Sequence, residues 1–488
     1  MTRQTALLPT GTWLMAKGYK RHDLTTGSIS RHVIRMAPPM AVAFLATMIF
    51  NIVDTWFVSR LGEKPLAAMG FTFPVVMLVH AVAMGLGLGV SASVSQTLGK
   101  GDDSRSRHLA SAGLVLCFLV FTCVSAIGLL AMDHIFSLLG AGGETLALTT
   151  SYMQVWFCFL PLAVLPMVGN NAIRATGDTL RPSMIMIAGA LLNCVLDPLL
   201  IFGTGFFPEL GIAGAAWATG ISRSLTMVLS FIIMRRFGLL APVWRDAAAV
   251  LKEWITIIRV ALPATATNLL MPLTNGVITR IIAGFGTAAV AATAAGQRVE
   301  MVAFLVPMAM GSALVPLIGQ NWGARRLGRV RRSYVVTNWY GFAYTAFCYF
   351  LAVPLAPVVA GWFSSNRLIT TLISHYLWIM LAGALLTHIV VHTGFALNAT
   401  ERPGQAALLN ATRLLGLVLP LAYAGSRLFG VHGVFLGMTA ANLTAGVIAL
   451  YWFLKAVPRQ TVDSLKQPLP SNAQEKKADG LRPTGRPS

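Results

Sequence analysis

Residues 33–58 read VIRMAPPMAVAFLATMIFNIVDTWFV, a stretch that is almost wholly apolar. A helix of about 20 apolar residues crosses the hydrocarbon core of a bilayer, so this run is long enough to span it. Its one acidic residue is Asp54. A carboxylate at the centre of a membrane helix costs ~2.5–3.5 kcal/mol on insertion scales, so such residues are rare and are functional by default. The stretch therefore predicts a transmembrane helix that carries a functional carboxylate, Asp54.

Similar apolar runs recur along the chain between short polar breaks. The whole chain of 488 residues is 56% apolar and only 11% charged, whereas soluble domains carry about 25% charged residues. This composition predicts an all-α polytopic membrane protein with 12 transmembrane helices. The expected spans are 33–58, 66–98, 109–131, 146–173, 182–204, 211–235, 251–284, 288–320, 333–360, 368–398, 404–426 and 431–455.

The basic residues indicate how these spans are oriented. The formal net charge is +20, and 29 of the 37 Lys and Arg residues fall in alternate breaks or in the two terminal segments. Because cytoplasmic loops carry the excess of Lys and Arg, both termini are expected in the cytoplasm. The positive charge is therefore a topology signal, and we expect no nucleic-acid partner.

The second half of the chain matches the first half at a constant offset. The matched pairs include Arg35 with Arg259, Pro39 with Pro263, Asn51 with Asn275, Gln96 with Gln320, and Gly99 with Gly323. Each copy holds six expected spans, so both insert the same way up, and the axis relating them runs along the membrane normal. We expect two six-helix lobes built by internal duplication. The expected organisation is a cytoplasmic N-terminal segment (1–32), an N-lobe (33–240), a C-lobe (241–460) and a disordered cytoplasmic tail (461–488).

Polar residues of the first copy fall at one depth. At 1.5 Å per residue, Asp54 lies ~28 Å beyond Arg35 and Asp197 lies ~24 Å beyond Arg181. Thr219 lies at a comparable level, ~12 Å into a span that enters from outside. Asn193 and Asp197 are four residues apart, so they share one face of a helix.

Two carboxylates close together in a low dielectric cannot both ionise cheaply, so this group predicts a proton or cation site. The alternative is a structural network in which Asp54 bonds a neighbour such as Asn51. Pro39 precedes Asp54 within the first span, and its missing N–H predicts a kink or hinge there. In the second copy Ile278 stands opposite Asp54, so the acidic chemistry is asymmetric.

Three other polar residues fall within second-half spans. Glu300 lies near mid-membrane and offers a possible second-lobe cation or substrate site, or a buried hydrogen-bonded tether. His388 and His392 are four residues apart, but no third ligand at helical spacing accompanies them, so hydrogen bonding or packing is favoured over a metal site.

The sequence contains no Walker motif, and no nucleophile with a base or metal triad at one depth. We therefore expect neither ATP-driven transport nor an intramembrane enzyme, and no cofactor beyond a coupling ion.

Several motifs in order resemble those of the MATE (multidrug and toxic compound extrusion) transporters. They are VDTWFVSRLG, SQTLGKGD, RATGDTLRPS, NCVLDPLLIFG, GIAGAAWATGIS and, in the second half, GQNWGA. The similarity runs from about Arg35 to Leu454. It implies export of organic, often cationic, compounds in exchange for H⁺ or Na⁺ across the bacterial inner membrane.

In the DinF-like branch, the resemblance implies a coupling site at Asp54, Asn193 and Asp197, with Thr219 as a further match and Pro39 as the point where the first helix bends. The NorM-like branch adds acids in the second lobe, where only Glu300 is available here, so the DinF-like branch and H⁺ coupling are favoured. We expect a monomer that binds cationic amphiphiles and membrane lipids. The alternatives are a flippase of lipid-linked precursors from the same superfamily and a non-transporting membrane scaffold.

Overall fold

The computed structural model describes residues 22–205, 207–243 and 246–457, and within them all regular secondary structure is helical. The helices are α1 (Ile29–Ser59), α2 (Glu63–Gly99), α3 (Asp103–Leu138), α4 (Gly143–Ala175), α5 (Leu180–Ile201), α6 (Ile212–Arg236), α7 (Ala247–Ala283), α8 (Thr287–Gly323), α9 (Leu327–Phe363), α10 (Arg367–Ala399), α11 (Pro403–Ala411), the π-helix η2 (Thr412–Val418) and α12 (Leu419–Ala456).

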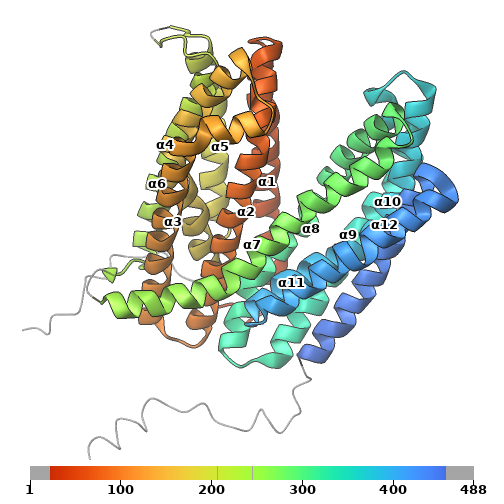
Figure 1. Cartoon of the computed structure of the whole chain (residues 1–488). Coiled ribbons are helices and arrows are strands. Elements are labelled where there is room, and N and C mark those ends of the chain that lie inside the picture. The colour runs from red at the N-terminus through yellow and green to blue at the C-terminus, as the bar shows by residue number, and fades with distance from the viewer. Residues whose placement is uncertain (1–21, 206, 244–245, 458–488) are drawn as a thin grey trace, which may run out of the picture.

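Eleven helical segments of the described chain are long and apolar enough to cross a membrane, and the last of them runs from Pro403 to Ala456. This last segment covers both the 404–426 and the 431–455 runs expected from hydropathy. The chain leaves helical geometry between those runs, at Phe429 and at Gly430, whose φ is 61°. A positive φ of this kind is readily adopted by glycine, which has no Cβ. The segment therefore turns back on itself at the expected break (Figure 1).

The helices form two bundles that diverge like the arms of a V (Figure 1). We call α1–α6 the N-terminal bundle and α7–α12 the C-terminal bundle. The first part of α7 packs against α2 and α3 of the N-terminal bundle, and α8 crosses both α1 and α2. The two bundles therefore meet at the narrow end of the V and separate toward the wide end.

The narrow end is closed by two hydrogen bonds between the bundles. Gln96 Nε2 donates to the carbonyl oxygen of Ala399 at 2.9 Å, and Gln320 Nε2 donates to that of Ala175 at 2.8 Å. The internal sequence match aligns the two donors with each other, and at the same offset it aligns the two acceptors. The two bonds are therefore equivalent contacts made in opposite directions.

Residues 22–28, which we call the N-terminal strap, also join the bundles at this end. The His22 N–H donates to the Thr176 carbonyl oxygen, and the Leu24 N–H donates to Gln320 Oε1 at 3.0 Å. The Arg329 guanidinium donates to the carbonyl oxygens of Leu24, Thr26 and Gly27 at 3.0–3.2 Å. The sequence predicted only a polar segment over 1–32, whereas α1 already begins at Ile29. The expected disordered tail, 461–488, lies outside the described residues.

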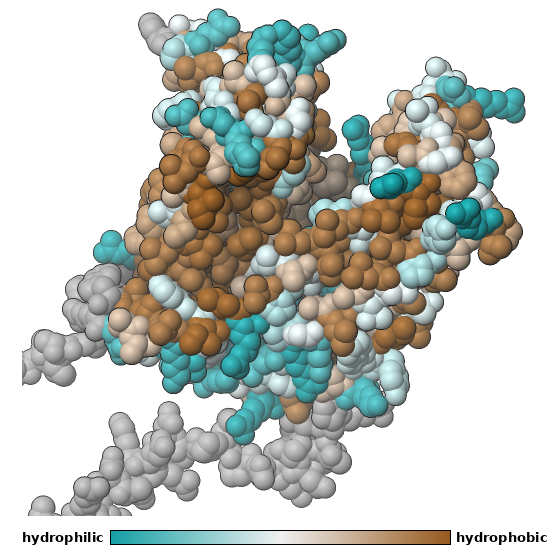
Figure 2. Space-filling view, viewed as in Figure 1, coloured by the Kyte–Doolittle hydropathy of each residue, from teal (hydrophilic) through white to brown (hydrophobic). Residues whose placement is uncertain are grey.

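The outer faces of both bundles are covered by apolar side chains, while polar residues gather at the two ends (Figure 2). Leu130, Trp362 and Leu428 are among many large hydrophobic residues that are strongly exposed, at 90%, 78% and 73%. A soluble monomer rarely presents so large an apolar surface. This distribution is that of a protein whose flanks contact lipid.

Candidate functional site

Asp54 lies on α1 and faces the interior of the N-terminal bundle. Its side chain is buried, and its Oδ1 has no hydrogen-bond partner among the described residues. Asn51, the neighbour that a structural network would use, is exposed, and its carbonyl oxygen accepts a bond from the Thr55 hydroxyl instead. The structural alternative based on Asn51 therefore finds no support in the described contacts.

Asp197, Asn193 and Thr219 form a hydrogen-bonded group where α5 meets α6. Asp197 is fully buried, and Asn193 lies one turn before it on the same face of α5. With the Asn193 amide oriented to satisfy both of its ends, its nitrogen donates to Asp197 Oδ2 at 3.0 Å. Its oxygen then accepts from the Thr219 N–H at 3.0 Å and from the Thr219 hydroxyl at 3.2 Å. The amide thus fixes the position of the Asp197 carboxylate.

The two acidic residues are electrostatic neighbours. Asp54 and Asp197 lie close enough for their charges to interact. Both also interact electrostatically with Tyr152, a buried residue of α4. The structure therefore brings together all four residues of the predicted coupling site, contributed by α1, α5 and α6. Such a site holds two acidic groups, one fixed by an amide and one with an oxygen that has no described partner.

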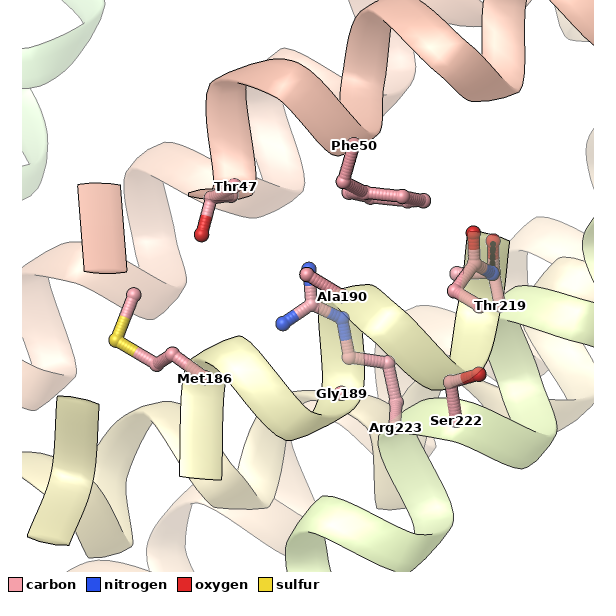
Figure 3. Close-up of a pocket in the computed structure, with 9 residues that line it drawn as sticks. Thr47, Phe50, Met186, Gly189, Ala190, Thr219, Ser222 and Arg223 are labelled. Carbon is pink, nitrogen blue, oxygen red and sulfur yellow. Dashed lines mark hydrogen bonds between the residues drawn. The ribbon is translucent and has the colours of Figure 1, made fainter. Parts of the chain in front are cut away.

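A small pocket lies beside this group, between α1, α5 and α6 (Figure 3). Its lining residues are Thr47, Phe50, Met186, Gly189, Ala190, Asn193, Thr219, Ser222 and Arg223. Phe50 supplies an aromatic wall. Sequence reasoning assigned no role to Arg223, although it falls within an expected span. The available signal was its spacing, because Arg223 lies four residues after Thr219 and so shares its face of α6.

Pro39 lies within α1, which continues as one helix from Ile29 through Pro38 and Pro39 to Ser59. The described helix therefore passes through the expected hinge. Bending of α1 at Pro39 stays a prediction.

Glu300 lies on α8 in the other bundle and does not join this group. The Tyr376 hydroxyl donates to Glu300 Oε2 at 2.6 Å, and the Glu300 carboxylate interacts electrostatically with Arg413 of η2. Arg413 Nε in turn donates to Asn442 Oδ1 at 3.0 Å. Of the two readings of Glu300, this geometry fits the hydrogen-bonded tether.

His388 and His392 are both buried, and both form hydrogen bonds. His388 Nε2 lies 3.2 Å from the Asn338 carbonyl oxygen, and His392 Nε2 lies 2.9 Å from the Pro307 carbonyl oxygen. Within residues 22–205, 207–243 and 246–457, no group of three or more His, Cys, Asp or Glu side chains is placed to hold a metal ion. Hydrogen bonding accounts for this pair.

Comparison with known proteins gives consistent matches over most of the chain. The sequence model of the MatE family matches residues 39–199 and again residues 263–424. The chain is 36% identical to the FAD transporter of Shewanella oneidensis over 432 residues, covering 88% of this chain and 96% of that protein. It is 26% identical to the multidrug export protein MepA of Staphylococcus aureus over 441 residues, covering 89% and 96%.

Solved structures also match this fold over most of the chain. The Vibrio cholerae MATE transporter VcmN, solved as an Asp→Asn mutant, superimposes with a TM-score of 0.85 at 27% identity, covering 90% of this chain and 99% of VcmN. The two segments matched by the family model begin at Pro39 and Pro263, a pair that the internal sequence match also aligns. The all-helical bundles, the apolar flanks and these matches together lead to one conclusion: the chain belongs to the MATE family of multi-pass membrane transporters.

Proposed function

We propose that this protein is a secondary active exporter of toxic organic compounds, driven by entry of H⁺ in exchange. The observation that carries the proposal is the buried Asp54 carboxylate, whose Oδ1 has no hydrogen-bond partner among the described residues and which interacts with Asp197. A proton or an organic cation can each neutralise this negative charge. Since both compete for it, binding of one favours release of the other, which is antiport.

The cycle uses alternating access. At the outside, Asp54 or Asp197 binds a proton, the attraction for the cationic compound is lost, and the compound leaves. At the inside, the proton dissociates and the site binds the next compound. Pro39 provides the bend in α1 that accompanies protonation. Na⁺ is the alternative coupling ion, and no other cofactor is assigned.

The architecture proposed for this cycle is 12 transmembrane helices in two six-helix lobes, related by a pseudo-two-fold axis along the membrane normal. The reciprocal Gln96 and Gln320 bonds and the two family matches, one in each half of the chain, support the duplication. The described ends of the chain lie at the narrow end of the V, which we assign to the cytoplasm from the distribution of Lys and Arg. We place the protein in the bacterial inner membrane as a monomer of the DinF-like branch. We assign it no enzymatic reaction.

The first prediction concerns Asp54. Asp54→Asn keeps the shape of the side chain but removes its charge, so efflux of a toxic cation from cells lacking other pumps should fall to background. Asp133→Asn, which changes an exposed acid of α3, should leave efflux intact. Undiminished resistance with Asp54→Asn at equal expression would remove Asp54 from the coupling site.

The coupling ion is tested in everted vesicles that carry a preset pH gradient. Adding the transported cation should discharge the gradient in the wild type and not in Asp54→Asn. A response that requires Na⁺ and moves no protons would make Na⁺ the coupling ion.

Flavin adenine dinucleotide is a second candidate substrate, favoured by the 36% identity to the FAD transporter over 88% of the chain. Flavin secreted by cells expressing the wild type and Asp54→Asn tests this candidate directly. Export of flavin that depends on Asp54 would place both substrate types in one mechanism.

A further inference from the structure

We propose that Arg223 forms an anion-binding subsite in the N-terminal bundle and takes the phosphate or carboxylate group of an exported aromatic compound. This inference rests on the proposed export function, and it extends the substrate class from organic cations to organic anions and zwitterions.

The position of Arg223 is the first observation. Its guanidinium points into the pocket between α1, α5 and α6, toward the space bounded by Thr47, Phe50 and Met186 (Figure 3). Arg223 lies more than three turns before the end of α6 at Arg236, so it is about 20 Å from that end of the helix. The positive charge therefore lies deep within the bundle.

The second observation is that Arg223 lacks a partner. Two other arginines within the membrane-spanning helices or at their ends are paired: Arg105 Nε donates to Glu253 at 3.0 Å, and Arg413 donates to Asn442. The Arg223 guanidinium has no hydrogen bond or ion pair within residues 22–205, 207–243 and 246–457. The adjacent Ser222 hydroxyl is also buried, lines the same pocket and has no partner among those residues. A charge and a hydroxyl left unpaired beside one pocket indicate a ligand that bonds both.

The acids of the coupling site do not serve as the counter-ion. Asp197 is held by Asn193, and Asn193 by Thr219, which lies one helical turn from Arg223 toward the wide end. The titratable neighbour of Arg223 is His80 on α2, which is neutral or positive and cannot neutralise it. Neither acid lines the pocket, and Arg223 is the one charged residue among the residues that do.

A neighbouring pocket also has an arginine among its lining residues. It shares Met186 with the first pocket and is lined by Met40, Phe44, Arg174, Pro182, Ser183 and Met186. Arg174 is buried there, and its guanidinium donates only to uncharged acceptors, the Asn170 carbonyl oxygen and the Ser312 hydroxyl. Two guanidinium groups without an acidic partner among the described residues thus line two pockets that share Met186.

The chemistry of these groups defines the ligand. Guanidinium binds phosphate or carboxylate through paired charge-assisted hydrogen bonds, and the unpaired hydroxyl of Ser222 can donate to a remaining oxygen. Phe50 offers an apolar face to an adjoining ring. The site therefore suits an aromatic compound that carries an acidic group.

The test uses the purified full-length protein in proteoliposomes with three probes. Riboflavin 5′-phosphate and riboflavin differ only in the phosphate, and ethidium is an aromatic cation. Arg223→Gln should lower transport of riboflavin 5′-phosphate by about 10- to 100-fold, as expected for the loss of a charged hydrogen-bonding partner. Transport of ethidium should be retained. Arg223→Lys keeps the charge but not the paired donors, so it should give an intermediate rate.

Two further variants complete the design. Arg298→Gln changes an exposed arginine of α8 and should leave all three rates unchanged. Ser222→Ala should lower only the rate for the phosphate probe, and it reports on the subsite if Arg223→Gln does not fold.

Wild-type protein that moves ethidium but not riboflavin 5′-phosphate would overturn the anion subsite and leave the export function standing. Equal effects of Arg223→Gln on the phosphate probe and on ethidium would also overturn it. Failure of the wild type to move ethidium or to discharge a pH gradient would instead count against the proposed function.

Discussion

The buried Asp54 carboxylate, whose Oδ1 has no hydrogen-bond partner among the described residues, lowers the stability of the folded protein. A buried polar group without a hydrogen bond forfeits its interaction with water, and the penalty is larger for a charge. Asp197, on the neighbouring helix α5, differs because the Asn193 amide donates a hydrogen bond to its carboxylate. Residues held in an unfavourable state by the surrounding fold are concentrated at functional sites. At the residue scale, the proposed coupling role therefore rests on Asp54, the acid with an oxygen that has no partner among the described residues.

The second prediction follows from this energetic argument. Asp54→Asn removes the charge and should raise the free energy of unfolding by about 1–3 kcal/mol at alkaline pH, where the carboxylate is ionised. The gain should shrink at acidic pH, because a protonated carboxyl group is also neutral. Thermal unfolding of purified protein in detergent measures both values, with Asp133→Asn as the control. A lower unfolding temperature for Asp54→Asn at alkaline pH would mean that an unrecognised partner stabilises the carboxylate.

The sequence was sufficient to place the polar residues at one depth, because helical rise converts residue number into height. It also paired Asn193 with Asp197, because residues four apart share a face. It did not predict which way Arg223 points or that Asp54 lacks a partner. Both depend on how each helix is rotated about its axis within the bundle, and that rotation is set by packing between distant segments.

Among the elements, α8 and η2 carry the main polar contacts of the C-terminal bundle described above. Glu300 accepts from Tyr376, and Arg413 of η2 donates to Asn442. Short π-helical segments are frequent at functional sites because they displace side chains from their usual positions. Arg298 is only two residues from Glu300, but residues at that spacing do not face each other on a helix, and the structure leaves Arg298 exposed. The electrostatic partner of Glu300 is instead Arg413, several helices further along the chain, which hydropathy and spacing cannot identify.

The N-terminal strap is a second element that hydropathy did not reveal, since its contacts are made by polar and backbone groups. Arg35 Nη2 lies 3.2 Å from His22 Nε2, so the ring must be neutral to accept this bond. Partial burial, followed by the nearby Arg35 guanidinium, lowers the pKa of His22 from its usual 6.5. The docked strap therefore favours the neutral ring.

The third prediction is the pH dependence of this strap. Because the pKa of His22 is lowered in the docked state, docking is fully stabilised above pH 6.5 and weakens as the pH falls below it. Hydrogen exchange of residues 22–28, corrected for intrinsic rates, should be faster at acidic pH. His22→Gln, which cannot be protonated, should remove most of the difference. Identical pH profiles for the wild type and His22→Gln would assign any pH effect to other groups.

At the scale of the whole molecule, closure of the narrow end depends on close contact between α2 and α8. A Cβ placed on Gly99 would lie 2.0 Å from the Gln320 carbonyl oxygen, and one on Gly323 would lie 2.0 Å from that of Gln96. These distances are far below van der Waals contact, so even a methyl group would push the backbones apart. The two bundles can therefore approach this closely only with glycine at both positions.

The fourth prediction is that Gly99→Ala opens the narrow end. Overpacking of this kind costs about 1–3 kcal/mol, which shifts an equilibrium between closed and open forms by about 5- to 150-fold. Labelling of a cysteine introduced at Ser95 by a membrane-impermeant reagent, from the side of the narrow end, should increase accordingly. Gly70→Ala is the matched control, since a Cβ on Gly70 of the same helix meets nothing within 4 Å. Equal labelling of both variants would show that this crossing does not limit closure.

The overall plan of the molecule was accessible from hydropathy and the repeat, because long apolar segments and self-matching are local properties of the sequence. The break between the last two expected spans, for example, coincides with Phe429 and Gly430. How the bundles are joined was not accessible. The bonds of Gln96 and Gln320 connect residues that are 303 and 145 positions apart, and no periodicity reports such contacts.

The form of those two glutamine bonds has an evolutionary consequence. Each donates to a main-chain carbonyl oxygen, at Ala399 and at Ala175, and every residue type carries that acceptor. A substitution at either acceptor position therefore keeps the carbonyl oxygen that accepts the bond. The two bonds depend on residue type only at the two donors, Gln96 and Gln320. A lineage of such transporters can therefore change the residues that line its pocket while it inherits the same closure unchanged.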